Sequence, residues 1–385
     1  MRIIVAHNNY MHRGGEDVVV ESELALLRAH GHELIEYRRD NAEIAGINKS
    51  ALLLDTIWSR KTVADITNLI RDFQPDVIHV HNTFPLISPS LYWAAQRASI
   101  PIIQTLHNFR LLCLNAMFLR EGKVCEDCLG RLPLVGIGHK CYRDSMVQSG
   151  VLAGTLTLHR GLRTYQNKIS RYIALNEFCR RKFIEGGLPA SRIVVKPNFI
   201  DFPASQNLQR QGFLFVGRLS EEKGIKTLMQ AIELLPGSVL RVAGVGPEMG
   251  FLNNVSGVVG IGNLSIDEVQ HEMQASMALV LPSIWFENFP RTIVEAFSCG
   301  LPVIASRIGA LADLVEHGVT GLLFQPGNAQ DLAKKMKWAL ENPILMEEMG
   351  HNARAKYLAE YTAERNHQQL IAIYQDAISE YDDTN

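Results

Sequence analysis

The segment LPSIWFENFPRTIVEAFSCGLPV occupies residues 281–303 and contains the pattern from which we predict the fold. An apolar run ends at Pro282, a loop carries Glu287, and an amphipathic stretch begins near Pro290 and stops at Gly300. Glycine ends helices because it readily adopts the left-handed conformation of a C-cap. A second β-branched run follows directly, so the segment is a strand, a loop, a helix and the next strand. We therefore predict a parallel βαβ unit with Glu287 just before its helix.

The same alternation of short β-branched runs and helical segments extends through both halves of the chain, from Ile3–Ala6 to Val303–Ala305. It predicts an α/β protein with two Rossmann-like, doubly wound parallel-sheet domains that face each other across a cleft. The predicted parts are an N-terminal domain over residues 1–197 with a Cys-rich insertion over 108–144, a C-terminal domain over 198–362, and a helix over 363–385 that returns to the first domain.

The composition is that of a folded protein, with 47% apolar and 20% charged residues in a chain of 385. A formal net charge of −2 lacks the basic footprint of a nucleic-acid-binding protein, so we expect no nucleic-acid partner. Residues 97–196 nevertheless carry 16 basic and 6 acidic side chains. This excess suits either an anionic membrane surface or an ordinary solvated face.

Two further features of the sequence concern location. The four-residue apolar run at the start is too short for the core of a secretory signal. No stretch approaches the roughly 20 apolar residues of a membrane span. We expect a cytoplasmic protein, with any contact at the inner face of the plasma membrane being peripheral.

Two glycine-containing turns are candidate phosphate sites. Gly14 and Gly15 follow the first strand and open the first helix, where backbone N–H groups attract anions. The alternative is a tight turn that needs glycine for its backbone angles. Gly217 follows a strand of the second domain, and Arg218 and Lys223 come just before the next helix. These two cations could clamp a diphosphate, or they could be ordinary surface charges.

Two other patterns in the second domain concern a nucleotide and a sugar. The string Gly244-x-Gly246 is weak evidence for a dinucleotide site, since a proline follows it directly. Glu287 and Glu295 are separated by seven residues across the loop-to-helix junction. Such a pair can accept hydrogen bonds from two sets of sugar hydroxyls. The alternative is an acidic helix N-terminus with a second glutamate on a solvated face.

Together these motifs resemble retaining glycosyltransferase family 4 of the GT-B fold, of the type that makes cell-surface polysaccharides or exopolysaccharides. The resemblance covers essentially the whole chain. It implies that Glu287 contacts the donor sugar, that Glu295 holds the ribose, and that Arg218 and Lys223 neutralise the departing diphosphate. It makes the first domain the acceptor-binding domain and the second the nucleotide-sugar-binding domain.

The resemblance also assigns roles to five single residues. Asn198 matches a hinge motif of the family, and His107 matches a histidine near the sugar. Without the resemblance, His107 could equally be a packed or capping residue. The loop here has Asn288 and Pro290 where the family often has small residues, so Asn288, Phe289 and Pro290 are expected to meet the sugar.

The resemblance implies a retaining hexosyltransferase that needs no metal for catalysis, with attack and departure on the same face of the sugar. We expect a UDP-linked donor, with UDP-glucose as the leading choice, and a glycan or lipid-linked oligosaccharide acceptor. One alternative is a nucleotide-sugar 2-epimerase of the same fold, and another is a noncatalytic scaffold subunit of a polysaccharide assembly.

Four cysteines of the insertion have the spacing C-x11-C-x2-C-x12-C. This pattern is compatible with a structural zinc site, with free thiols, or with disulfides, which a reducing compartment disfavours. The candidate ligands are Cys113, Cys125, Cys128 and Cys141.

Overall fold

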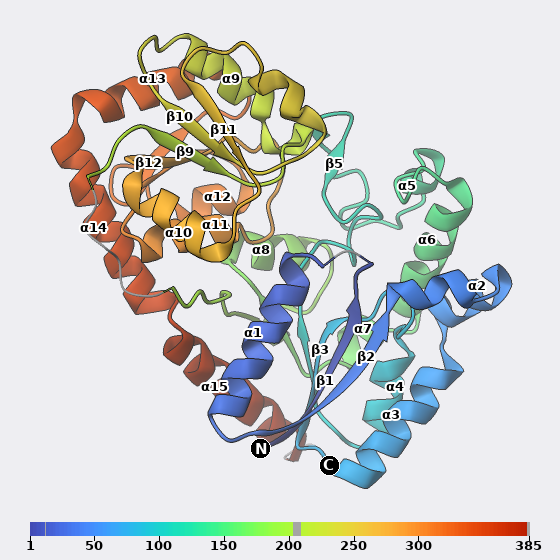
Figure 1. Cartoon of the computed structure of the whole chain (residues 1–385). Coiled ribbons are helices and arrows are strands. Elements are labelled where there is room, and N and C mark those ends of the chain that lie inside the picture. Colours follow the sequence, from blue (N-terminus) through green and yellow to red (C-terminus); the bar gives the residue numbers. More distant parts are fainter. Residues whose placement is uncertain (12, 203–208, 383–385) are drawn as a thin grey trace. The chain divides into compact units, whose positions relative to one another are not determined.

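A computed structural model describes residues 1–11, 13–202 and 209–382, and its elements are labelled in Figure 1. The chain forms two compact units. Unit 1 comprises residues 1–117, 126–196 and 367–385, and unit 2 comprises residues 118–125 and 197–366. The last three residues of the predicted C-terminal helix, 383–385, lie outside the described residues.

Unit 1 contains a six-stranded, fully parallel sheet in the order β2-β1-β3-β4-β7-β8. The order reverses direction between β1 and β3, which is where doubly wound sheets bind ligands beyond the carboxyl ends of their strands. The strands are β1 (Arg2–Asn9), β2 (Glu33–Asp40), β3 (Val77–Asn82), β4 (Ile102–Thr105), β7 (Arg171–Ala174) and β8 (Ile193–Val195).

Helices cover both faces of this sheet, as parallel strands buried on two sides require. Val20 and Leu24 of α1 and Leu370 and Tyr374 of α15 share one buried cluster with the strands, so α15 is part of the core of unit 1. The helices are α1 (Gly15–Ala29), α2 (Lys49–Ile57), α3 (Arg60–Phe73), α4 (Ser90–Arg97), α5 (Val135–Gly138), α6 (Met146–Gly161), α7 (Thr164–Asn167), α8 (Glu177–Glu185) and α15 (Ala363–Asp382).

Unit 2 repeats the plan with a parallel sheet in the order β11-β10-β9-β12-β13-β14 (Figure 1). Phe213 and Phe215 on β9 face one buried cluster and Leu214 between them faces the other, so alternate side chains bind helices on opposite faces. The strands are β9 (Phe213–Val216), β10 (Leu240–Ala243), β11 (Val258–Gly262), β12 (Ala278–Leu281), β13 (Val303–Ser306) and β14 (Gly321–Phe324).

The helices of unit 2 are distributed between these two clusters. Helices α9 and α13 contribute to the first, α10, α11 and α12 contribute to the second, and α14 contributes to both. They span α9 (Ile225–Glu233), α10 (Ile266–Ala275), α11 (Arg291–Ser298), α12 (Gly309–Leu314), α13 (Ala329–Glu341) and α14 (Pro343–Glu360).

The predicted insertion over residues 108–144 is divided between the two units. Its hairpin of β5 (Leu119–Arg120) and β6 (Lys123–Val124) groups with unit 2. The aromatic ring of Phe118, just before β5, meets the ring of Phe286 edge-on with centroids 6.3 Å apart. Such aromatic pairs add stability beyond simple burial, which gives a physical reason for the hairpin to group with unit 2.

Candidate active site

Two loops of unit 2 pack backbone against backbone at the carboxyl ends of β9 and β10. The amide of Gly217 donates to the carbonyl of Ala243 over 3.0 Å. Gly244 has a φ of 137°, and a Cβ there would lie 1.9 Å from the carbonyl oxygen of Gly217. A Cβ at Gly246 would lie 2.2 Å from the carbonyl oxygen of Leu219. Both positions therefore require glycine, because any side chain would force the loops apart.

These loops line a cavity of about 570 Å³. The lining of the cavity also includes Arg218, Asn263, Leu264 and Val269. The cavity thus combines apolar side chains, exposed backbone and one cation at the carboxyl edge of the sheet. Small-molecule sites in α/β proteins have this character and this position.

Lys223 and Glu287 form an ion pair beside the next strand. The Lys223 Nζ donates to Glu287 Oε1 over 2.6 Å, and the Ser283 hydroxyl donates to the same oxygen over 2.7 Å. Glu287 is only 7% exposed, and the Lys223 ammonium also lies 5.7 Å from the centre of the Trp285 ring. The turn before α9 and the loop before α11, distant in sequence, therefore place a cation and an anion together in a sheltered position.

The second glutamate of the pair lies within helix α11. Burial raises the pKa of Glu295, and Arg291, whose guanidinium is 3.8 Å away, partly offsets that rise. The Nε of Arg291 and the Nε1 of Trp285 are buried and have no hydrogen-bond partner among the described residues. Because buried polar groups are normally paired, these two donors are available to a ligand.

The remaining predicted residues of unit 2 are placed as follows. Asn198 is buried at the start of the unit. In the loop before α11, Asn288 is half-buried, Phe289 packs against the core, and Pro290 is buried at the N-cap position. The sequence did not single out Trp285, since a tryptophan in a loop has no spacing signal.

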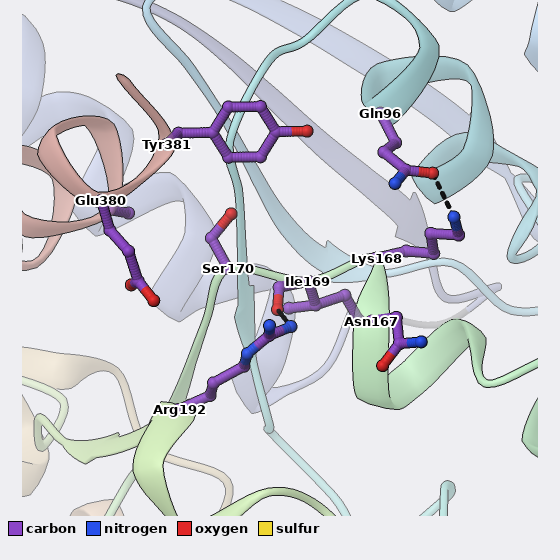
Figure 2. A pocket seen from close by; sticks show the side chains of 9 residues that line it. Gln96, Asn167, Lys168, Ile169, Ser170, Arg192, Glu380 and Tyr381 are labelled. Atoms are coloured by element: carbon purple, nitrogen blue, oxygen red, sulfur yellow. Dashed lines mark hydrogen bonds between the residues drawn. The ribbon is translucent and has the colours of Figure 1, made fainter. Parts of the chain in front are cut away.

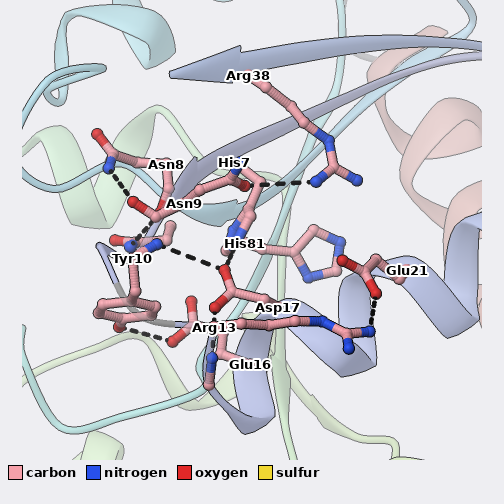
Figure 3. A network of polar contacts seen from close by, with 12 residues as sticks. His7, Asn8, Asn9, Tyr10, Arg13, Glu16, Asp17, Glu21, Arg38 and His81 are labelled. Atoms are coloured by element: carbon pink, nitrogen blue, oxygen red, sulfur yellow. Dashed lines mark hydrogen bonds and ion pairs between the residues drawn. The ribbon is translucent and has the colours of Figure 1, made fainter. Parts of the chain in front are cut away.

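In unit 1, the side chain of Asp17 accepts a hydrogen bond from one of the backbone N–H groups of the predicted anion site. Its carboxylate accepts from the amide of Gly14 over 2.7 Å and from His7 Nε2 over 2.8 Å (Figure 3). The amide of Gly14 is therefore already bonded within the chain, whereas Gly15 is exposed at the first position of α1. The three-residue spacing between Gly14 and Asp17 is that of a helix capping box, a signal that could have indicated this contact.

His107 lies just beyond β4 at the carboxyl edge of the same sheet. Its Nε2 is 2.8 Å from Nδ1 of His81 on β3, and the two rings are stacked. Burial lowers the pKa of His107 to about 3. The imidazole is therefore neutral at physiological pH, so it can exchange hydrogen bonds with a sugar but does not supply a positive charge.

Glu16 forms a second polar group at this edge, which sequence reasoning missed. The Tyr10 hydroxyl donates to its Oε2 over 2.8 Å (Figure 3). Asn108 Nδ2 lies 3.3 Å from the same oxygen. The other oxygen, Oε1, is buried without a partner among the residues described. Burial raises the pKa of Glu16 to about 7, with Asp17 contributing and the Tyr10 and Asn108 hydrogen bonds opposing the rise.

This raised pKa predicts a pH dependence of stability. The folded state holds the Glu16 proton more tightly than the unfolded chain, whose ordinary value is 4.5. The contribution of Glu16 to the free energy of unfolding should therefore fall by up to about 3 kcal/mol as pH rises from about 4.5 to about 7, and should level off beyond. Urea unfolding of wild type and Glu16→Gln across this range measures the difference. Glu21→Gln on the same helix is the control, and a pH-independent difference for Glu16→Gln would contradict the prediction.

A cavity of about 280 Å³ lies elsewhere in unit 1, near the amino ends of β4 and β7 (Figure 2). Two cations line it, but both donate to neutral groups. Lys168 bonds to Gln96, and Arg192 donates to the carbonyl of Ile169 over 3.0 Å. The residues that line it include none of the predicted site residues, and ligands of doubly wound sheets bind at the opposite edge.

Among the four predicted zinc ligands, Cys113 and Cys128 are buried, and Cys125 and Cys141 are half-buried. Cys125 belongs to the segment that groups with unit 2, and the other three belong to unit 1. The zinc site stays a prediction. In the described part of the chain, no helix combines the length and apolarity needed to cross a membrane.

Two parallel α/β units, one with a glycine-lined cavity at the carboxyl ends of its strands, place the protein in the GT-B structural class. Comparison with known families identifies it further. The family model described as Glycosyltransferase Family 4 matches residues 13–202, and the model described as Glycosyl transferases group 1 matches residues 198–356. The chain belongs to the family 4 glycosyltransferases, so the predicted fold class and family are confirmed.

Individual relatives are more distant. The D-rhamnosyltransferase WbpZ of Pseudomonas aeruginosa is 32% identical over 176 residues, which are 42% of this chain and 46% of that protein. TuaC of Bacillus subtilis, provisionally named a teichuronic acid biosynthesis glycosyltransferase, is 26% identical over 79% of this chain and 72% of its own length. The chain spans about half the length of the first curated relatives it matches.

Solved structures share the fold at low identity. HepE of Anabaena, crystallised with UDP-glucose, superposes with a TM-score of 0.66 at 17% identity. The superposition covers 98% of this chain and all of HepE. At this identity the likeness establishes the architecture and not the substrate.

Proposed function

We propose that the protein transfers a hexose from a UDP-linked donor to a glycan or lipid-linked oligosaccharide, with retention of configuration, in polysaccharide biosynthesis. Glucose is the leading choice of sugar. The observation that carries the proposal is the Lys223–Glu287 ion pair in the same unit as the Arg218 cavity, at the carboxyl ends of neighbouring strands. A cation for phosphate and a carboxylate for sugar hydroxyls are the two groups that a nucleotide sugar requires.

The charged side chains of unit 2 support the proposal that the nucleotide-sugar donor binds in this unit. The Gly217 and Gly244 loops pack backbone against backbone and line the cavity together with Arg218, where a nucleotide can bind. Glu287, held by Lys223, can accept hydrogen bonds from the sugar. Glu295 on α11 is proposed to hold the ribose. HepE, which shares the fold, was crystallised with UDP and with UDP-glucose, which supports a UDP donor here.

The proposed reaction breaks the bond between the anomeric carbon and the β-phosphate oxygen. The electron pair leaves with UDP, and the Arg218 and Lys223 cations stabilise the added negative charge. The acceptor hydroxyl attacks on the same face, its oxygen bonds to the anomeric carbon, and its proton passes to the departing phosphate. His107 of unit 1, neutral at physiological pH, is proposed to exchange a hydrogen bond with a sugar hydroxyl.

Measurement of UDP release with UDP-, GDP- and ADP-sugars, each with and without lipid-linked oligosaccharide, tests this proposal. We expect release from a UDP-hexose that depends on the acceptor, with a product that retains the anomeric configuration. UDP release without any acceptor would instead identify a 2-epimerase. No turnover of any donor, with no binding of UDP by calorimetry, would favour a noncatalytic scaffold.

We also propose that Cys113, Cys125, Cys128 and Cys141 bind one structural zinc ion that takes no part in the transfer. Thiolates are preferred zinc ligands, and four of them complete a tetrahedral site. Protein purified without chelator should contain about one equivalent of zinc. Sugar transfer should still occur in the presence of EDTA, if it is measured before the protein unfolds. Well under one equivalent by elemental analysis would refute the zinc site.

Contact with an anionic membrane is proposed for unit 1. Several of the basic side chains in residues 97–196 already bind within the chain, since Arg171 pairs with Asp376 and Lys182 pairs with Glu126. Others, such as Lys140 and Arg163, are exposed and can meet an anionic surface. Exposed apolar side chains around α5 and α6 also support the proposal, and these are Leu132, Leu134, Val135, Met146, Val147, Leu158 and Leu162.

Co-sedimentation with vesicles tests this membrane contact. Binding should require an anionic lipid and weaken with salt, because the attraction to a charged surface is screened. Val147→Asp, on the exposed face of α6, should reduce the bound fraction, whereas equal binding to neutral vesicles would argue against an electrostatic contribution.

A further inference from the structure

A buried carboxylate joins three nitrogen-bearing side chains in the interior of unit 1. Glu23 on α1 is 4% exposed. Its Oε2 lies 3.0 Å from Lys196 Nζ, and its Oε1 lies 3.1 Å from His79 Nδ1 and 3.5 Å from His81 Nε2. His81 is in turn 2.8 Å from His107. A continuous row of polar contacts therefore runs from Glu23 through His81 to His107 at the carboxyl edge of the sheet.

The charge state of each group in this row follows from its surroundings. Burial by itself would raise the pKa of Glu23, but Lys196 and the imidazoles outweigh it and hold that pKa well below its usual range. Burial lowers the pKa of His81 well below its usual value, as it does for His107. At physiological pH the row consists of one carboxylate and two neutral imidazoles.

Glu23 Oε1 has no hydrogen-bond partner among the described residues, and His81 Nε2 faces it at 3.5 Å. The carboxylate attracts a proton on that nitrogen and would repel a lone pair there. His81 therefore holds its proton on Nε2, toward Glu23, and its Nδ1 is left with a lone pair. That lone pair faces His107 Nε2 at 2.8 Å, so His107 must donate from Nε2. A neutral imidazole carries only one proton, and the Nδ1 of His107 is consequently a hydrogen-bond acceptor.

We propose that Glu23 is a positioning residue that, acting through His81, fixes His107 as the Nε2–H tautomer and so presents the Nδ1 lone pair of His107 to the ligand. The structure gives this Nδ1 no hydrogen-bond partner among the residues it describes, and His107 is half-buried at the carboxyl edge of the sheet. If the proposed function holds, the group that meets this nitrogen is a hydroxyl of the sugar or the acceptor, which donates its proton to it. The opposite tautomer would direct an N–H at that ligand and would favour a hydrogen-bond acceptor there instead of a donor.

The nearby donors do not favour a metal ion instead. Glu23, His79 and His81 bring ligand atoms within 4.8 Å of one another. The Lys196 ammonium, however, lies 3.0 Å from the carboxylate and would repel a second cation. His79 also has other partners, because its Nδ1 lies 2.7 Å from the Tyr374 hydroxyl and its Nε2 lies 2.7 Å from the Thr105 hydroxyl.

Long-range ¹H–¹⁵N spectra of the full chain labelled with ¹⁵N-histidine measure the tautomer directly, with no substrate present. His107→Gln assigns the His107 signals by their loss. In wild type we expect a protonated Nε2 and an unprotonated Nδ1. Glu23→Gln should shift His107 to a mixture of both tautomers, because an amide can either donate to His81 or accept from it. Glu23→Asp, which keeps the carboxylate, should retain the wild-type form.

Two controls separate this effect from loss of structure. Tyr374→Phe removes a hydroxyl from the same buried cluster without touching His81 and should leave the His107 tautomer unchanged. If Glu23→Gln fails to fold because Lys196 is left buried and unpaired, the double variant Glu23→Gln/Lys196→Met removes both charges together. A wild-type His107 protonated on Nδ1, or an unchanged tautomer in a folded Glu23→Gln protein, would overturn the inference.

Kinetics provide the second measurement once a donor is known. Loss of one oriented hydrogen bond should lower kcat/KM of Glu23→Gln roughly 10-fold, with recovery in Glu23→Asp. The spectra decide the tautomer even if no sugar transfer is found, so failure of the proposed function and failure of this inference are distinguishable. An altered tautomer with unchanged kcat/KM would show that Nδ1 of His107 does not meet the reacting ligand, and would refute that part of the proposal.

Discussion

Glu287→Gln should lower the kcat of sugar transfer by roughly 100- to 1000-fold, the usual effect of removing one preorganised electrostatic contact. The glutamine keeps the size of the side chain and loses its charge. It can no longer attract the Lys223 ammonium, which is 2.6 Å from Oε1 in wild type, and it binds sugar hydroxyls more weakly than a carboxylate. Initial rates of UDP release at saturating donor and acceptor measure the effect.

The control for Glu287→Gln is the same change at Glu233, an exposed residue of α9 in the same unit. Thermal unfolding of both variants shows whether a loss of activity reflects a loss of fold. The Glu233 variant should keep the wild-type rate. A folded Glu287→Gln protein with a wild-type kcat would remove Glu287 from the catalytic machinery and would leave the Lys223 pair as a structural feature only.

Sequence reasoning predicted well the local position of Glu287, in the loop between β12 and α11. The loop and the helix that position it are local, and the pattern of Pro282, Pro290 and Gly300 marks the ends of the strand and the helix. The same holds for Gly217 and Arg218, which follow a short apolar strand that contains two phenylalanines. Local signals of this kind suffice for the order of elements and for the family.

Contacts between distant segments could not be predicted in this way. Lys223 and Glu287 are 64 residues apart. They meet because β9 and β12 are neighbours in the sheet, although 61 residues, 217–277, lie between the end of β9 and the start of β12. Glu23 and Lys196 are 173 residues apart. No periodicity in the chain indicates which buried carboxylate faces which cation, since that depends on strand order and not on spacing.

Strand β11 and the hairpin of β5 and β6 were not predicted, because their sequences carry little periodic signal. Strand β11 contains two glycines and has no fully buried residue, so it lacks the alternating apolar pattern of a half-buried strand. The hairpin of β5 and β6 has two residues in each strand, too short for any periodic signal. Its grouping with unit 2 depends on packing of the kind made by Phe118 and Phe286, which the sequence alone does not reveal.

Arg218→Ala should weaken the binding of UDP by about 10- to 150-fold, as expected for the loss of a hydrogen bond to a charged group worth about 1.5–3 kcal/mol. The Arg218 side chain is exposed at the cavity formed by the Gly217 and Gly244 loops, where a diphosphate can reach it without rearrangement of the fold. Calorimetric titration of wild type and variant with UDP, UMP and uridine measures how the effect depends on phosphate charge.

The comparison among these three ligands shows which part of the nucleotide Arg218 contacts. If Arg218 contacts the diphosphate, its loss should affect UDP most, UMP less and uridine little, because uridine has no charge for the guanidinium to meet. Lys334→Ala, on the exposed face of α13, removes one positive charge from the same unit and should leave all three affinities unchanged. Equal weakening of uridine and UDP would instead mean that the side chain shapes the nucleoside cavity, and that Lys223 is left as the cation available to the leaving group.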